Sequence, residues 1–297
     1  MPRPNFFIVG APKCGTSSLH DYMGQHPQVF MSKLKEPLHF GRDLEINSIW
    51  CYRDDQRYLK LFDGAGGARR IGESSAWYLY STTAAAEIHD FDPQAKIIAM
   101  LRQPVDAMYS LHGQFLYSAN EDIPDFGQAL AAQEQRRLGQ RIPATAAIPK
   151  ALLYSQVYDY TEQVRRYFDV FGRENVMVIL FDDFVRNTEK IYRQVLEFLE
   201  LDSGFAADLR VVNPAKPVSP RLSGFLGRRP WLRKLAHTLV PPSLQQGAMN
   251  LLYKLTGTLD RPARIPAPLR AQLLPPCVPQ IRQLAQLLGR DLELWCR

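Results

Sequence analysis

The chain has 297 residues, of which 46% are hydrophobic and 22% are charged. This is the composition of a globular protein long enough for one large α/β domain or two small ones, and it excludes a disordered chain, a collagen-like repeat and a disulfide scaffold. The formal net charge of +6 is unevenly spread, because the window 209–259 holds eight basic residues and no acidic one. The rest of the chain carries 28 basic and 30 acidic residues. This window is therefore the first candidate for contact with an anionic partner.

The four cysteines and six histidines show neither a CxxC pair nor the spacing of a metal site. This pattern indicates free thiols in a reducing compartment and no bound metal. The apolar run at the N-terminus is too short for a signal peptide, and no apolar stretch approaches the ~20 residues that cross a bilayer. We expect a cytoplasmic protein, with peripheral contact to the inner face of the membrane as an open alternative.

Strand-like and helix-like segments alternate along the first two thirds of the chain. Short β-rich runs predict strands at 6–9, 70–72, 96–101 and 175–181. Helical patterns predict helices at about 16–25, 52–62, 83–91, 105–118, 126–138, 152–171 and 189–201. The alternation predicts an α/β fold in three layers, with a central parallel sheet flanked by helices.

The last third of the chain has a different composition. Residues 213–279 hold 12 of the 22 prolines, which disfavours long regular elements before a closing helix at about 278–288. We therefore expect one domain over 1–297, in which 209–297 forms a proline-rich basic wrap and the closing helix.

A phosphate-binding loop is indicated where the first predicted strand ends, in the run G-A-P-K-C-G-T-S-S-L at residues 10–19. Backbone N–H groups of a glycine-containing turn and of a helix start bind anions. Lys13 adds a full charge, and the hydroxyls of Thr16, Ser17 and Ser18 add donors. The competing interpretation is an ordinary strand–helix turn in which Thr16 or Ser17 caps the helix.

This loop is P-loop-like but departs from the loop of ATP and GTP hydrolases. Gly10 and Gly15 have the Walker spacing, yet Thr16 stands where that pattern has its lysine. Arg102 follows the strand at 96–101, where a hydrolase would carry an acidic Mg²⁺ ligand. Cys14 lacks the nearby arginine that a thiol phosphatase loop needs, so we interpret it as a small loop residue.

A second anion site is indicated after the strand at 96–101. Arg102 ends the strand, Pro104 suits the first turn of a helix, and Ser110 follows about two turns later. A guanidinium and a hydroxyl that face one point suit a phosphate monoester, at the sheet edge where open α/β folds bind ligands. Taken alone, the pair would be interpreted as a surface ion pair.

Together, segments 12–19 and 101–110 resemble the two nucleotide-binding signatures of sulfotransferases that use 3′-phosphoadenosine 5′-phosphosulfate (PAPS). Segments 26–40, 72–79 and 287–295 also match, and the chain looks like the bacterial branch related to heparan-type carbohydrate sulfotransferases. The resemblance implies that the 5′-phosphosulfate is bound by Lys13, Cys14, Gly15, Thr16, Ser17 and Ser18, and the 3′-phosphate by Arg102 and Ser110.

Sulfuryl transfer to a hydroxyl needs a general base and positive charge at the leaving phosphate, but no metal. Lys13 is the candidate for the leaving phosphate. The resemblance implies that Glu36 is the base, within the segment Lys35-Glu36-Pro37-Leu38-His39-Phe40. Leu38 shifts His39 one residue further from the glutamate than in the common family pattern, so His39 remains an alternative base. A further alternative is that Glu36 only pairs with Lys13 or Lys35.

Four other positions carry weaker expectations. Lys216 and Arg221 are candidates for a charge near the 3′-phosphate, with a solvated basic loop as the alternative. Trp77 could stack on adenine, although an aromatic after a strand more often belongs to the core. Glu73 ends a predicted strand beside the site, and we expect it to orient neighbouring backbone or hydroxyls.

The expected function is transfer of a sulfuryl group from PAPS to a hydroxyl of a carbohydrate, glycolipid or small natural product. The alternative is a non-catalytic nucleotide-binding or scaffold protein with the same fold. Segment 133–143 could recognise an acidic or sugar acceptor, with a charged helix face as the default. Segment 221–240 has an amphipathic pattern that fits peripheral membrane contact, a cap over the cofactor being the competing interpretation. No nucleic-acid-binding module accompanies the charge, so we expect no nucleic acid.

Overall fold

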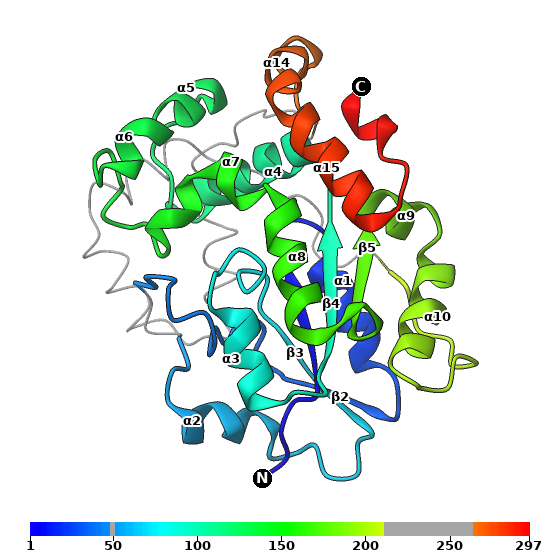
Figure 1. Ribbon diagram of the computed structural model, residues 1–297. Helices are drawn as coiled ribbons and strands as arrows, with labels where there is room; N and C mark the ends of the chain where they lie inside the picture. Colours follow the sequence, from blue (N-terminus) through cyan, green and yellow to red (C-terminus); the bar gives the residue numbers. More distant parts are fainter. Residues whose placement is uncertain (48–50, 211–263) are drawn as a thin grey trace.

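The computed structural model describes residues 1–47, 51–210 and 264–297. Within them, five parallel strands form one sheet in the order β2-β3-β1-β4-β5 (Figure 1). In register, Phe7 of the central strand lies opposite Glu73 on one side and Ile97 on the other. The strands are β1 (Phe6–Gly10), β2 (Val29–Met31), β3 (Arg70–Ser74), β4 (Lys96–Leu101) and β5 (Val176–Leu180).

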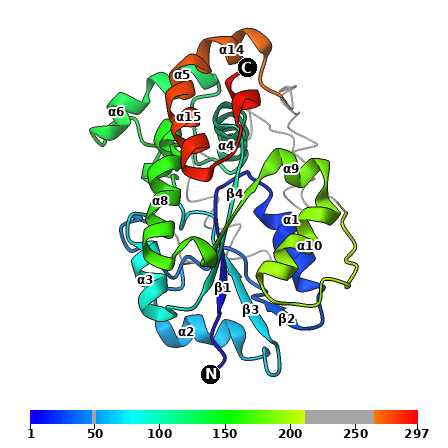
Figure 2. The same ribbon diagram turned by 45° about the vertical axis from the view of Figure 1, so that its right-hand side comes forward.

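Helices cover both faces of the sheet, so the predicted three-layer α/β fold is confirmed. Figure 2 shows α3 (Ala84–Phe91), α8 (Tyr160–Phe171) and α15 (Val278–Leu288) on one face. The opposite face carries α1 (Thr16–Gly24), α9 (Phe181–Arg186) and α10 (Thr188–Phe198). Every residue of β1 is buried, as expected for a central strand that is covered on both sides.

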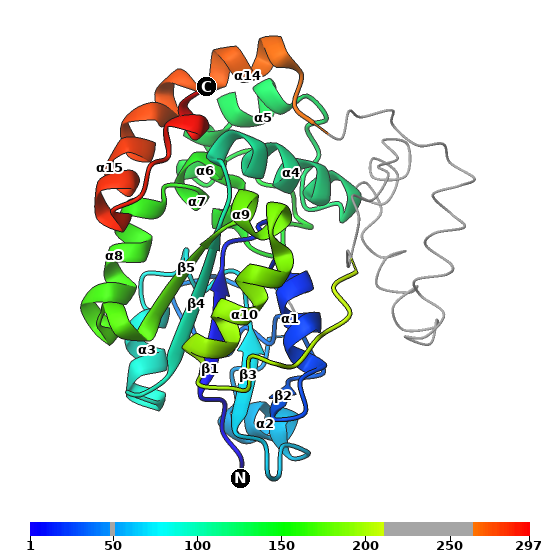
Figure 3. The same ribbon diagram turned by 90° about the vertical axis from the view of Figure 1, so that its right-hand side faces the viewer.

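Further helices lie beyond the carboxyl ends of β4 and β5. Figures 1 and 3 show α4 (Pro104–Tyr117), α5 (Phe126–Ala131) and α14 (Ala267–Leu273) at this end, while the N-terminus lies at the other. The other helices are α2 (Asp55–Leu59), α6 (Gln133–Arg137) and α7 (Tyr154–Val157). Short 3-10 helices span Lys60–Phe62, Pro149–Leu152, Arg173–Asn175, Pro275–Cys277 and Glu293–Cys296.

Several predicted boundaries agree closely with the structure. The strand predicted at 96–101 is β4, and the closing helix predicted at 278–288 is α15. Two long predicted helices are wrong, however: 126–138 is divided into α5 and α6, and 152–171 into α7 and α8. β2, α9 and α14 were not predicted.

Part of the basic window lies outside the described residues. This applies to Lys216, to Arg221 and to the segment 221–240 for which membrane contact was considered. Of the helices that the structure describes, none is both long and apolar enough to cross a membrane.

Candidate functional site

The predicted phosphate loop joins β1 to α1 and is held between β4 and the segment that follows β3. The Ala11 N–H donates to the Met100 carbonyl of β4 at 2.7 Å. On the other side, a Cβ on Gly10 would lie 2.6 Å from the Ala76 carbonyl, so only glycine permits this close approach. Lys13 sits in the loop with a φ of 63°. The loop is therefore positioned by both strands that flank β1.

Gly15 occupies the N-cap position of α1, so the competing interpretation in which Thr16 or Ser17 caps the helix is wrong on this point. Gly15 has a φ of 92° and no side chain caps the helix, which begins at Thr16. A Cβ on Gly15 would also press against Phe181 and Met100 at 3.2–3.3 Å. In the described part of the chain, the Thr16 and Ser17 amides have no hydrogen-bond partner. This end of α1 is consequently open to an anion.

Two tyrosines at the break between α7 and α8 form hydrogen bonds with the phosphate loop and with Arg102. The Tyr158 hydroxyl donates to the Pro12 carbonyl at 3.1 Å, and the Tyr160 hydroxyl donates to the Arg102 carbonyl at 3.0 Å. Cys14 is fully buried beside them, with its Sγ 3.7 Å from the Tyr160 hydroxyl oxygen. Burial raises the pKa of the Cys14 thiol to about 12, despite the nearby Arg102 charge. The Cys14 side chain therefore has almost no thiolate at neutral pH and is a poor nucleophile.

Replacing Cys14 with alanine is expected to leave kcat within about threefold of wild type, because a buried thiol with a raised pKa is a poor nucleophile. Steady-state rates of the purified variant at pH 7 and 8 provide the measurement. Loss of all activity in a variant that retains its melting temperature would instead give the Cys14 sulfur a chemical role.

Arg102 and the loop meet at the carboxyl edge of the sheet. The Arg102 Nη1 donates to the Lys13 carbonyl at 3.3 Å, and the guanidinium lies over the Phe181 ring, 4.8 Å from its centroid. The predicted second anion site is thus adjacent to the first. Ser110 is half-buried on α4 and does not line the cavity described next, so its part in binding a 3′-phosphate stays a prediction.

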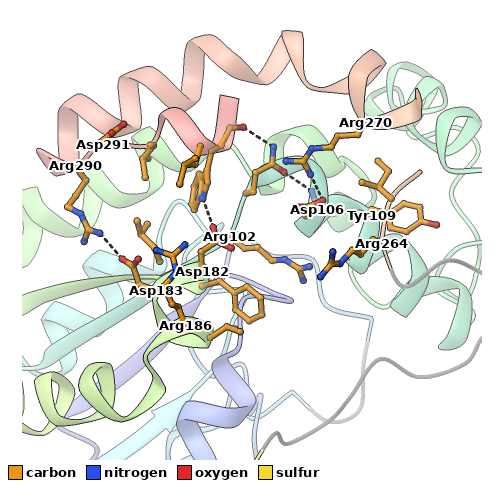
Figure 4. A pocket seen from close by; sticks show the side chains of 18 of the residues that line it. Arg102, Asp106, Tyr109, Asp182, Asp183, Arg186, Arg264, Arg270, Arg290 and Asp291 are labelled. Carbon is orange, nitrogen blue, oxygen red and sulfur yellow. Dashed lines mark hydrogen bonds and ion pairs between the residues drawn. The ribbon is translucent and has the colours of Figure 1, made fainter. Parts of the chain in front are cut away.

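A cavity of about 820 Å³ opens beside Arg102, between α4, α9 and the C-terminal segment. Figure 4 shows Arg102 and Arg264 pointing into the same space. The aspartates at its wall are engaged: Asp106 pairs with Arg270 at 2.6 Å and Asp183 with Arg290 at 2.7 Å, while Asp182 accepts from the Trp295 indole at 2.6 Å.

Within the described ranges, Arg102, Arg186 and Arg264 of this cavity pair with no carboxylate. The Arg102 and Arg264 guanidinium groups point into one space without a counter-ion and repel one another, so the cavity favours an anionic ligand. Arg264 lies outside both motifs, so no sequence pattern pointed to it. The candidates proposed for this role, Lys216 and Arg221, are not among the described residues.

Glu36 lies next to the loop, on the β3 side. Its Oε2 accepts from the Ala76 N–H at 2.9 Å, and Ala76 is the residue whose carbonyl abuts Gly10. The Glu36 N–H donates to the Ser74 carbonyl at 2.9 Å, and its φ is 60°. Oε1 pairs with Lys35 at 2.7 Å, as one of the alternatives for Glu36 expected, yet the side chain remains 31% exposed.

His39 is placed differently from Glu36. It is buried, its ring is stacked on Tyr58 with centroids 3.9 Å apart, and its Nδ1 lies 2.6 Å from the Tyr52 carbonyl. The Nε2 lies 3.6 Å from the exposed carboxylate of Asp55. Burial lowers the pKa of His39. These contacts are all with the segment 52–58 and the adjacent Phe40, so the structure does not bring the imidazole to the loop.

Glu73 is buried at the end of β3 and orients hydroxyls, as its predicted role required. Its Oε2 accepts from the Tyr58 and Tyr78 hydroxyls at 3.0 Å each. The Tyr78 hydroxyl in turn accepts the N–H groups of His39 and Phe40 at 2.9 and 3.2 Å. Burial raises the pKa of Glu73 to about 7. Glu73 therefore holds the segment that carries Glu36 through the Tyr78 hydroxyl.

Lys13 and Trp77 both contact α4. The Lys13 Nζ donates to the Gln114 Oε1 of α4 at 3.5 Å. Trp77 stacks on Phe115, the next residue of α4, with ring centroids 6.1 Å apart and planes at 14°. Trp77 packs against the core and does not line the arginine-rich cavity, so its proposed contact with adenine finds no support in this geometry.

Segment 133–143 does not present all its charges to solvent. Arg136 is fully buried and pairs with the equally buried Glu121 at 2.7 Å. The Tyr154 hydroxyl also donates to Glu121, at 2.8 Å. Arg136 thus fastens α6 to the body of the protein, and for this residue the interpretation as a charged helix face is wrong.

Three comparisons with known proteins bear on this site. The model of the sulfotransferase domain family matches residues 3–211. The crystal structure of a sulfotransferase from Alicyclobacillus acidocaldarius is similar with a TM-score of 0.75 at 30% identity, covering 100% of each chain. Carbohydrate sulfotransferase 15 of Mus musculus is 29% identical over 253 residues, which covers 67% of this chain and 44% of that protein.

A second curated relative matches a shorter part of the chain. The bifunctional heparan sulfate N-deacetylase/N-sulfotransferase 2 of Homo sapiens is 32% identical over 109 residues, which covers 36% of this chain and 12% of that protein. The chain therefore spans less than half the length of these curated relatives. The domain match covers more than half of the chain, and the bacterial structure matches along its whole length. On this ground the chain belongs to the sulfotransferase family.

Proposed function

We propose that this protein transfers a sulfuryl group from PAPS to a hydroxyl of an acceptor. The observation that carries the proposal is the contact between the two anion sites, in which the Arg102 guanidinium donates to the Lys13 carbonyl. A ligand with phosphate groups at both ends would be held by the open start of α1 at one end and by the arginines of the cavity at the other.

The residues present fit PAPS. The unpartnered Thr16 and Ser17 amides and the left-handed Gly15 turn suit a phosphosulfate. Arg102 and Arg264, which pair with no carboxylate in the described chain, suit the 3′-phosphate. Bound PAPS supplies an activated sulfuryl group, and its 5′-phosphate is the leaving group.

Glu36 and Lys13 are the chemical residues of the proposed reaction. Glu36, anchored by the Ala76 amide and still partly exposed, removes the proton of the acceptor hydroxyl. The hydroxyl oxygen attacks sulfur from the side opposite the phosphate. Lys13, in the loop, neutralises the charge that develops on that phosphate. Gln114 holds the Lys13 ammonium in place from α4.

The proposed acceptor is a carbohydrate hydroxyl, with a glycolipid or a small natural product as the other candidates. Two relatives support this choice by their names, a carbohydrate sulfotransferase and a heparan sulfate N-deacetylase/N-sulfotransferase.

Arg102→Ala and Arg264→Ala are each expected to weaken binding of the product 3′-phosphoadenosine 5′-phosphate (PAP) about tenfold or more, because each removes a charged donor to phosphate. Isothermal titration calorimetry of PAP measures the effect. Arg193→Ala is the matched control, since Arg193 is exposed on α10 and pairs with Glu189. Unchanged PAP affinity in both cavity variants would contradict the assignment of this cavity.

Transfer from labelled PAPS to a panel of sugars, phenols and lipids tests the activity itself. Tight PAP binding without transfer to any acceptor would favour the non-catalytic nucleotide-binding alternative.

A further inference from the structure

Trp77 and Phe115 stack on each other, and each directly follows a residue that binds one of the two groups to which the chemistry is assigned. Trp77 directly follows Ala76, whose N–H holds the Glu36 carboxylate at 2.9 Å. Phe115 directly follows Gln114, whose Oε1 accepts from the Lys13 ammonium at 3.5 Å. The stack therefore links the element that holds the base to the helix that holds the lysine.

We propose that Trp77, backed by Phe115, is the platform on which the acceptor binds, and that the acceptor presents a pyranose ring to it. This inference rests on the proposed sulfotransferase function and deepens it. Trp77 packs against the core but is only half-buried, so part of its indole is accessible, whereas the stacked Phe115 is buried. A large aromatic ring with a firm support and a partly open surface is suited to hold a flat ligand ring.

Stacking on Trp77 also directs the reacting group. A ring that lies flat on an aromatic surface carries its equatorial hydroxyls in its own plane, at its edge. The Glu36 carboxylate is bound by the residue before Trp77 and the Lys13 ammonium by the residue before Phe115, so the stack joins the two segments that hold the reacting groups. One ring hydroxyl would thus face the base while the ring itself is held by apolar contact.

Polar groups around the platform favour a sugar over a plain phenol. Gln114 uses its Oε1 for Lys13, and its amide nitrogen has no hydrogen bond among the described residues. Lys35, which pairs with Glu36, is also partly exposed. A pyranose has several hydroxyls that can use such donors, whereas a phenol has one.

The platform is separate from the proposed nucleotide site. Neither Trp77 nor Phe115 lines the cavity that contains Arg102 and Arg264. A change at Trp77 should therefore act on the acceptor and not on the nucleotide.

The test compares wild type, Trp77→Ala, Trp77→Phe and the control Phe168→Ala. Phe168 is a half-buried aromatic on α8 beneath the Arg173 guanidinium, away from the loop. Initial rates with labelled PAPS are measured for methyl glycosides and short oligosaccharides in one arm and for simple phenols in the other. Saturation-transfer NMR on the PAP complex detects glycoside binding independently of turnover.

Trp77→Ala is expected to raise the KM for the pyranose acceptor about tenfold or more, with Trp77→Phe less affected and the KM for PAPS unchanged. Phe168→Ala should behave as wild type. An unchanged acceptor KM in Trp77→Ala overturns the platform. Transfer to phenols alone, or no glycoside signal in the wild-type PAP complex, overturns the sugar assignment. Failure of the proposed function would look different, as absence of both PAP binding and transfer in wild type.

Discussion

Replacing Lys13 with alanine is expected to lower kcat about 10²- to 10³-fold, the usual cost of removing one preorganised group that stabilises transition-state charge. The Lys13 backbone has a φ of 63° in the turn between β1 and α1, and its side chain is held by Gln114. The Lys13 side chain is therefore oriented by a contact with α4. Its effect should be larger on kcat than on KM, because charge at the bridging oxygen grows as the S–O bond breaks.

The measurement is steady-state transfer from PAPS, with PAP affinity followed by calorimetry. Lys60→Ala provides the control, since Lys60 is exposed in the 3-10 helix after α2 and far from the loop. Circular dichroism must show that Lys13→Ala retains the fold. A folded Lys13→Ala enzyme with wild-type turnover would remove the loop from the mechanism.

Glu36→Gln is expected to cut kcat about 10²- to 10⁴-fold, the range for loss of a general base, with little change in PAP affinity. Glutamine keeps the size of the side chain, and its carbonyl oxygen can still accept the Ala76 N–H. The substitution therefore removes the basic oxygen while the local geometry is retained. It also removes the charge that pairs with Lys35.

His39→Asn is the informative comparison for the base. An asparagine amide can still donate to the Tyr52 carbonyl, which lies 2.6 Å from the His39 Nδ1, so this substitution keeps a donor for that contact. We expect this variant to lose less kcat than Glu36→Gln, because the buried imidazole contacts Tyr58 and not the loop. If the order of the two losses were reversed in folded variants, His39 would be the base.

The sheet and most of the helices that cover it could be predicted from local sequence patterns. β4 and α15 have uninterrupted apolar or helical periodicity, and their predicted bounds match the structure. β2 spans only Val29–Met31, too short for alternation to be visible. At the break between α7 and α8, Tyr158 and Tyr160 contact the Pro12 and Arg102 carbonyls, which are distant in sequence, so local periodicity could not reveal the break.

The site was predictable where a residue lies inside a motif and unpredictable where the fold supplies it. Lys13, Arg102 and Glu36 were named from sequence, and the structure brings them to one edge of the sheet. Arg264 lines the cavity from a segment that is distant in sequence, and no local sequence pattern predicts this contact. Glu36 and His39 differ in the direction of their side chains, which sequence spacing alone does not determine.

The position of β1 between β3 and β4 has a kinetic consequence for the proposed reaction. The residues assigned to the acceptor, Glu36 and Trp77, are anchored on the β3 side, whereas Arg102 follows β4. The two substrates would then approach the central loop from opposite flanks, so neither must leave before the other can enter. Initial-rate plots should consequently show intersecting lines, the signature of a ternary complex, and not the parallel lines of a ping-pong cycle.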